Sequence, residues 1–135
     1  MSGKKRLIAV AVTLTSGILV LCFYDPNSKH LTSGYRRNLF EGDTYYIDRP
    51  GERFASDGGI FEGSVEELGW SDALIVAKVT RNYKGDLDGW YVLDVATRSV
   101  RGPITIEELN RDPVLSKIER YKSSDTKMRK SRIVR

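Results

Sequence analysis

Cysteine and histidine are scarce in this chain of 135 residues, which contains one of each. With Cys22 as the only cysteine, no internal disulfide can form, so the hydrophobic core must hold the fold together. Zinc sites built from cysteine and histidine are excluded as well. The only histidine, His30, lies just beyond an apolar segment, and a Ser-His-Asp or Cys-His catalytic arrangement therefore cannot be assembled in the folded part.

Carboxylates remain as candidates for catalysis. The candidate pairs are Glu66 with Glu67, Asp86 with Asp88, and Glu107 with Glu108. Adjacent carboxylates on a strand point to opposite faces, and carboxylates at a helix start cap the helix, so each pair has a structural explanation. Residues 86–89 lack the ligand pattern of an EF-hand loop, and no glycine-rich phosphate loop is present. We therefore expect no enzyme, no cofactor and no metal site, and a carboxylate-dependent hydrolase is the least favoured function.

An uncharged apolar segment occupies residues 7–24 (LIAVAVTLTSGILVLCFY) and follows the basic Lys4-Lys5-Arg6. As a helix it would reach about 27 Å, close to the roughly 30 Å of a hydrocarbon core. It is longer than the apolar core of a signal peptide, which has about 7–15 residues. The segment predicts a single transmembrane anchor or uncleaved signal. A core helix of a soluble protein is the alternative, but the segment has no polar face.

The flanks of this segment predict its orientation. Basic residues precede it, which favours a cytoplasmic start at residues 1–6 and a periplasmic or extracellular domain on a bacterial inner membrane. No small-residue cleavage site is present. Cys22 stands where a lipoprotein signal has its lipidated cysteine, but Leu21 replaces the small residue that should precede it. Lipidation of Cys22 is therefore an alternative to the retained anchor.

Charge is unevenly distributed after the anchor. We expect a linker at residues 25–33, a domain at 34–122 and a basic disordered tail at 123–135. Residues 31–116 carry ten basic and fifteen acidic side chains, whereas residues 117–135 carry eight basic and two acidic ones. The expected contacts with lipid headgroups are Lys127, Arg129, Lys130 and Arg132. A tail that folds back on the acidic body is the alternative, and nucleic acid would require the inverted topology.

The residue patterns predict an α+β fold. It comprises an N-terminal membrane helix, a small antiparallel sheet of about four to six strands, and one or two short C-terminal helices. Strands are expected at residues 34–40, 45–47, 60–62, 73–79 and 89–94, with a long hairpin loop before the last. Ser64 and Glu67 fit a capping box, so a helical turn competes with strand at 65–68. Residues 100–103 should lead out of the sheet. Thr105 and Glu108 form a second capping box, and another short helix should start at Asp112-Pro113.

Three different stretches of the domain together form one sequence pattern. They are GWSDA at residues 69–73, WYVLD at 90–94 and GPITIEEL at 102–109. The pattern resembles small bacterial membrane-anchored or lipoprotein domains of unknown function, over about forty residues. The resemblance implies an envelope location and an α+β fold, and it implies no active site.

Aromatic side chains are the candidates for recognition. Adjacent residues on a strand point to opposite faces, so one of Tyr45 and Tyr46, and one of Trp90 and Tyr91, is expected on an outer face. Exposed aromatics beside arginine suit protein contacts. The candidate protein-binding residues are Arg36, Arg37, Tyr45, Tyr46, Tyr83, Asp86, Asp88 and Tyr91. The alternative is that these aromatics fill the core.

The expected function is a membrane-anchored module that binds an unidentified protein. An immunity protein against a toxin that acts outside the membrane is one form, because the acidic body would suit a basic partner. The alternative is an accessory structural subunit of a membrane complex. In that case Thr13 and Gly17 of the anchor would provide a small-xxx-small contact.

Overall fold

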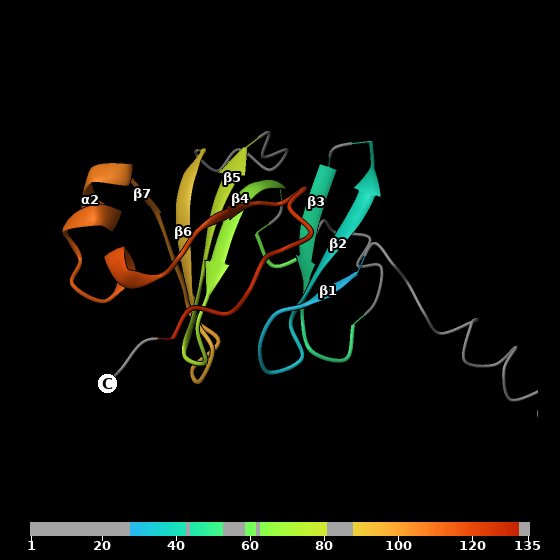
Figure 1. Ribbon diagram of the computed structural model, residues 1–135, viewed down its shortest axis with the longest axis horizontal. Helices are drawn as coiled ribbons and strands as arrows, with labels where there is room; N and C mark the ends of the chain where they lie inside the picture. The colour runs from blue at the N-terminus through green and yellow to red at the C-terminus, as the bar shows by residue number, and fades with distance from the viewer. Residues whose placement is uncertain (1–27, 43, 53–58, 62, 81–87, 133–135) are drawn as a thin grey trace, which may run out of the picture.

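The computed structural model describes residues 28–42, 44–52, 59–61, 63–80 and 88–132, which form two antiparallel sheets side by side (Figure 1). The three-stranded sheet has the order β1-β2-β3, with β1 (Lys29–His30), β2 (Arg36–Glu41) and β3 (Thr44–Asp48). The five-stranded sheet has the order β7-β6-β5-β4-β8. Its strands are β4 (Ser64–Trp70), β5 (Leu74–Thr80), β6 (Gly89–Asp94), β7 (Val100–Ile104) and β8 (Tyr121–Lys122).

The predicted α+β class is wrong, because the described part of the chain is mostly β. Its helices are the six-residue α2 (Ile106–Arg111) and the three-residue 3-10 helix η1 (Leu115–Lys117). The one sheet expected from the sequence is two sheets. No helix in the described residues is long and apolar enough to cross a membrane. Residues 7–24, where the sequence predicts the membrane helix, lie outside that part.

Burial on both faces of strand β5 explains why residues 74–77 are all apolar. The strand pairs with β4 on one side and β6 on the other, and both of its faces are covered. Ile75, Ala77 and Val79 belong to the larger core cluster, while Val76 belongs to a smaller cluster with Val92. A strand covered on both faces favours consecutive apolar side chains, which gives the run at residues 74–77 in place of an alternating pattern, and the run ends at the partly exposed Lys78.

Burial on both faces also contradicts the expectation that one of Trp90 and Tyr91 in β6 lies on an outer face. Trp90 and Tyr91 do point to opposite faces, but both are buried, at 5% and 8% exposure. Trp90 packs in the smaller cluster and Tyr91 in the larger one. Tyr91 therefore belongs to the core and does not form the predicted protein-binding surface.

Helix α2 starts where its capping box predicts. Thr105 Oγ1 accepts a hydrogen bond from the Glu108 backbone N–H at 3.2 Å, and Glu108 Oε2 accepts one from the Thr105 N–H at 2.7 Å. After α2, Asp112 Oδ1 accepts hydrogen bonds from two backbone N–H groups at the start of η1. Leu115 of η1 and Ile118 after it are buried against the five-stranded sheet with Leu109. Val114, directly before η1, is exposed.

Two local expectations are wrong, and one open alternative is decided. Residues 60–61 form a turn in place of a strand. At residues 65–68, where a helical turn competes with strand, the chain forms strand β4. Val65 and Leu68 are fully buried between the sheets, which favours the strand. Residues 100–103 do not leave the sheet, since Val100 pairs with Leu93 as part of β7.

The C-terminal segment, residues 118–132, is packed on the domain. It is drawn in red and crosses in front of β4, with which β8 pairs through Glu67 and Lys122 (Figure 1). Met128 is 3% exposed in the larger core cluster, and the Ser131 N–H donates to the Trp70 carbonyl at 2.8 Å. Over residues 123–132 the structure thus differs from the disordered tail that charge and composition predict. Backbone hydrogen bonds and one buried methionine anchor a segment with few apolar residues.

Candidate functional site

A cleft of about 600 Å³ opens between the two sheets at the start of β4. Tyr45 of β3, residues 64–67 of β4, Thr80 of β5 and residues 122–124 line it. Lys78 lies beside it, with Nζ 3.5 Å from Glu66 Oε2 and 3.9 Å from Glu67 Oε2. One ammonium thus faces two carboxylates, and because these pairs are partly exposed they add little stability. The cleft therefore presents hydroxyls, an aromatic ring and charges of both signs.

Arg37 fixes the aromatic side of the cleft. Its guanidinium carbon lies 5.0 Å from the centre of the Tyr45 ring, a cation–π distance. Its Nη1 donates a hydrogen bond to the carbonyl oxygen of Ser123, which joins β2 to the C-terminal segment. Burial lowers the pKa of Arg37 below its usual value, and Tyr45 acts in the opposite direction. Arg37 is a buried support of the cleft, and it contacts the half-buried Tyr45 in the cleft lining.

The predicted protein-binding residues that the structure describes do not form one surface. Tyr45 lines the cleft, while Arg37 and Tyr46 are buried. Arg36 is half-buried on β2, and Asp88 is exposed just before β6. Tyr83 and Asp86 lie outside the described residues. Of the predicted set, only Tyr45 is both accessible and part of a concave site in the described structure.

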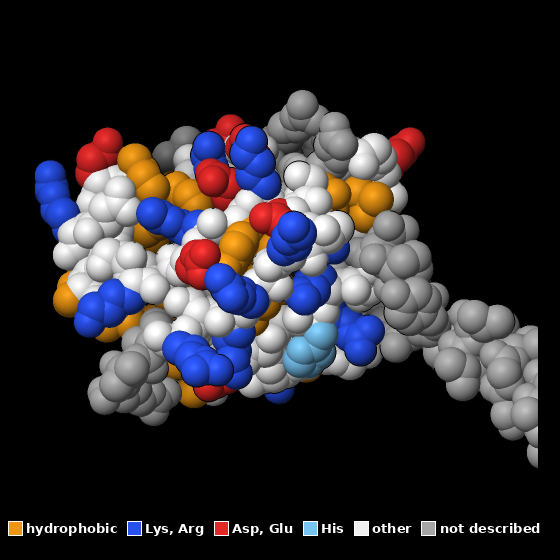
Figure 2. Space-filling view, in the orientation of Figure 1, with side chains coloured by type: hydrophobic (Ala, Val, Ile, Leu, Met, Phe, Trp, Pro, Cys, Tyr) orange, Lys and Arg blue, Asp and Glu red, His pale blue; other side chains and the backbone are white. Residues whose placement is uncertain are grey.

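A second concave site, which we call the basic groove, opens at the other end of β4 and has a volume of about 570 Å³. Residues 29–33, Trp70, Asp72 and residues 128–130 line it. Three of these side chains are basic, namely Lys29, Arg129 and Lys130, and His30 lies among them. Figure 2 shows the histidine on one face with several Lys and Arg side chains. The groove is therefore suited to an anionic ligand.

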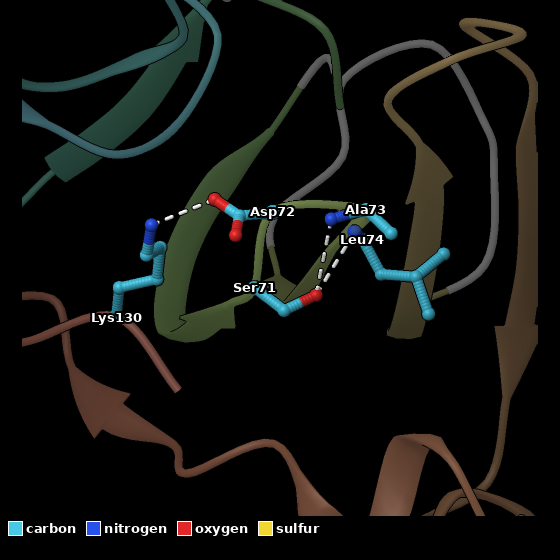
Figure 3. A network of polar contacts seen from close by, with 5 residues as sticks. All are labelled: Ser71, Asp72, Ala73, Leu74 and Lys130. Carbon is cyan, nitrogen blue, oxygen red and sulfur yellow. Dashed lines mark hydrogen bonds and ion pairs between the residues drawn. The ribbon is translucent and has the colours of Figure 1, made fainter. Parts of the chain in front are cut away.

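One ion pair crosses the wall of the basic groove. Lys130 Nζ lies 2.6 Å from Asp72 Oδ1, and the Asp72 side chain points toward Lys130 and away from Ser71 (Figure 3). Ser71 Oγ accepts hydrogen bonds from the Ala73 and Leu74 N–H groups at 3.3 and 3.2 Å, which fixes the turn that carries Asp72 (Figure 3). Asp72 is the only carboxylate among the described lining residues. The positive charge of Lys29 and Arg129 is thus not balanced within the lining.

Trp70 lies at the base of the basic groove. It is 2% exposed, and its indole nitrogen has no hydrogen-bond partner within the described part of the chain. Its backbone carbonyl accepts the hydrogen bond from Ser131. Trp70 is consequently held by packing and by its main chain, and it provides a rigid floor beneath the charged side chains.

Strand β4 connects the two sites. Residues 64–67 line the cleft and the last residue, Trp70, lines the basic groove, a separation of about 10–20 Å at roughly 3.3 Å per residue. The C-terminal segment follows the same course, with residues 122–124 at the cleft and 128–130 at the groove. The cleft and the basic groove therefore lie at opposite ends of the boundary between the two sheets.

Sequence reasoning identified Arg129 and Lys130 but missed the other side of the basic groove. Lys29 and His30 were expected in a linker, yet they form β1, with Lys29 paired opposite Arg37. Asp72 reads as an ordinary turn residue. No local pattern could reveal this grouping, since β1 is only two residues long and exists through its pairing with β2.

Metal binding and known relatives provide no further guide to the site. No group of three or more His, Cys, Asp or Glu side chains that could hold a metal ion occurs in the described residues. No protein-family model matches the chain, and no curated protein or solved structure is significantly similar to it.

Proposed function

We propose that this chain is a membrane-tethered module that binds a protein partner through the cleft between its sheets. The observation that carries the proposal is the Tyr45 ring, which lines a roughly 600 Å³ cleft and contacts the buried Arg37. Rigid aromatic side chains at concave sites are typical anchors of protein interfaces. The tether is residues 7–24, with the domain periplasmic or extracellular on a bacterial inner membrane.

The position of the cleft supports this function. Lys29 in the basic groove follows Tyr24, the end of the apolar segment, by five residues, which reach at most about 18 Å. The cleft lies about 10–20 Å further along β4. If residues 7–24 lie in a membrane, the groove end of the domain stays near the surface. The cleft end is then free to meet a partner.

The chemistry of the cleft indicates the kind of partner segment. Its volume lies within the roughly 300–1,000 Å³ of binding pockets, but hydroxyls and charges of both signs dominate its lining. Such a lining suits a polar loop or extended segment of a protein, with Tyr45 providing apolar contact. Glu66 and Glu67 share Lys78 as an ion-pair partner, which favours recognition over acid–base catalysis. An immunity-type protein is one form of this function.

Affinity purification of the full chain from detergent-solubilised membranes tests the proposal. Tyr45→Ala should reduce recovery of a stoichiometric partner by at least ten-fold, since anchor residues at interfaces contribute about 2 kcal/mol or more. Phe40→Ala is the matched control, because Phe40 is an exposed aromatic residue on β2 that does not line the cleft. Thermal unfolding of both variants separates loss of binding from loss of fold.

Two results would contradict the proposal. Equal recovery of the partner by Tyr45→Ala and by the unmodified chain would exclude the cleft as the contact site. Loss of the partner when residues 7–24 are replaced by an unrelated apolar segment would favour an accessory subunit bound through its anchor.

A further inference from the structure

We infer that the basic groove docks on anionic lipid headgroups and thereby holds the domain against the membrane with the cleft facing outward. The inference deepens the proposed function, on whose membrane tether it rests. It concerns the opposite end of β4 from the partner cleft and involves different residues. The two can therefore be tested separately.

The charge of the groove supports an anionic surface as its ligand. Lys29, Arg129 and Lys130 line the groove. Among the described lining residues, the one carboxylate is Asp72, and it pairs with Lys130. Lys127 and Arg132 are exposed on the same C-terminal segment. Each basic residue close to an anionic bilayer strengthens attachment by about 1 kcal/mol, or roughly five-fold. The three basic residues of the groove lining are enough to orient a small domain.

Chain geometry places this face at the membrane. Since only five residues separate Tyr24 from Lys29, the groove cannot move more than about 18 Å from the end of a membrane-inserted segment. A short tether also makes docking intramolecular, at an effective concentration that a free protein would not reach. Weak charge contacts are then sufficient.

The groove fits a headgroup layer better than a single soluble phosphate. A site for one phosphate gathers buried donors around one point, whereas the cations here lie on an open surface. Arg129 is exposed, Lys29 is half-buried, and the Lys130 side chain retains 45% of its accessible area. Spread, exposed cations match the repeated charges of a bilayer surface.

The test uses the full chain in nanodiscs of zwitterionic lipid, with or without 30% phosphatidylglycerol. The rates of acetylation of individual lysines are measured by mass spectrometry. Lys29 and Lys130 should react at least five-fold more slowly in the anionic discs. Lys78, beside the cleft, should react equally in both, and 0.5 M NaCl should abolish the difference because salt screens exposed charges.

Charge variants sharpen the test, with Lys29 as the reporter. Arg129→Gln should reduce the protection of Lys29 by roughly five-fold, while Asp72→Asn should increase it by a similar factor. Lys117→Gln, on the exposed side of η1, is the matched control and should leave the protection unchanged. The gain expected for Asp72→Asn cannot arise from misfolding.

Three outcomes would overturn the inference. Equal reactivity of Lys29 in both kinds of disc excludes docking on anionic lipid. Protection in zwitterionic discs by glycerol phosphate or inorganic phosphate identifies a site for a soluble anion, and protection by hexaglutamate identifies a protein site.

A chain that washes off zwitterionic discs but stays on anionic ones disproves the tether of the proposed function and leaves the docking supported.

Discussion

Lys130 Nζ lies 2.6 Å from Asp72 Oδ1 and joins two parts of the chain that are 58 residues apart. The pair links the C-terminal segment to the turn between β4 and β5, and it forms part of the wall of the basic groove. Both side chains are well exposed, so solvent screens their attraction. The pair therefore influences the charge of the groove more than the stability of the fold.

Breaking this pair should cost little stability. We expect Asp72→Asn to lower the free energy of unfolding by less than about 1 kcal/mol, as for other exposed ion pairs. Urea unfolding at low and high salt measures the change. A loss of several kcal/mol would mean that the pair is a structural lock and that the groove wall depends on it.

The C-terminal segment should behave as part of the core. Met128→Ala should destabilise the protein by about 2–5 kcal/mol, because Met128 is buried in the larger core cluster. Arg132→Ala, an exposed change in the same segment, is the control and should have almost no effect. Urea denaturation of the two variants compares them directly. Equal stability would show that the segment is only loosely attached.

Gly69 allows the C-terminal segment to lie close to β4. A Cβ atom at this position would lie 2.9 Å from Ile118 Cγ2 and would also meet the Glu119 carbonyl oxygen. Gly69→Ala should therefore displace the segment and destabilise the fold by about 1–3 kcal/mol. Faster hydrogen exchange of the Ser123 and Ser131 amides would report the displacement. Unchanged exchange would contradict it.

Asp112 should make stability depend on pH. Hydrogen bonds from the Leu115 and Val114 backbone N–H groups lower the pKa of Asp112 below its ordinary 3.8. A depressed folded-state pKa contributes stability above the unfolded pKa and loses it as the pH falls through the folded value. The gap in unfolding free energy between the unmodified chain and Asp112→Ala should therefore be present at pH 6 and shrink below about pH 4. A gap that is constant with pH would rule out this titration.

The elements predicted correctly are those with strong local signals. The apolar runs of β5 and β6 and the capping box of α2 each act within a few residues, so they can be recognised without tertiary context. Strands β1 and β8 have two residues each and exist only through pairing with β2 and β4. The competing signal at residues 65–68 shows the same effect, since pairing with β5 and burial outweigh a local capping pattern.

The sequence by itself determined which segments are apolar, where α2 is capped, and that the positive charge of the domain gathers near its C-terminal end. Only the tertiary structure decided that residues 29–33 and 128–130 meet over Trp70 and Asp72 to form the basic groove. It likewise decided that Tyr45 lies at a cleft while Tyr91 is in the core. The physical reason is that local patterns act over a few residues. The two sites depend on pairing and burial between segments far apart in the chain.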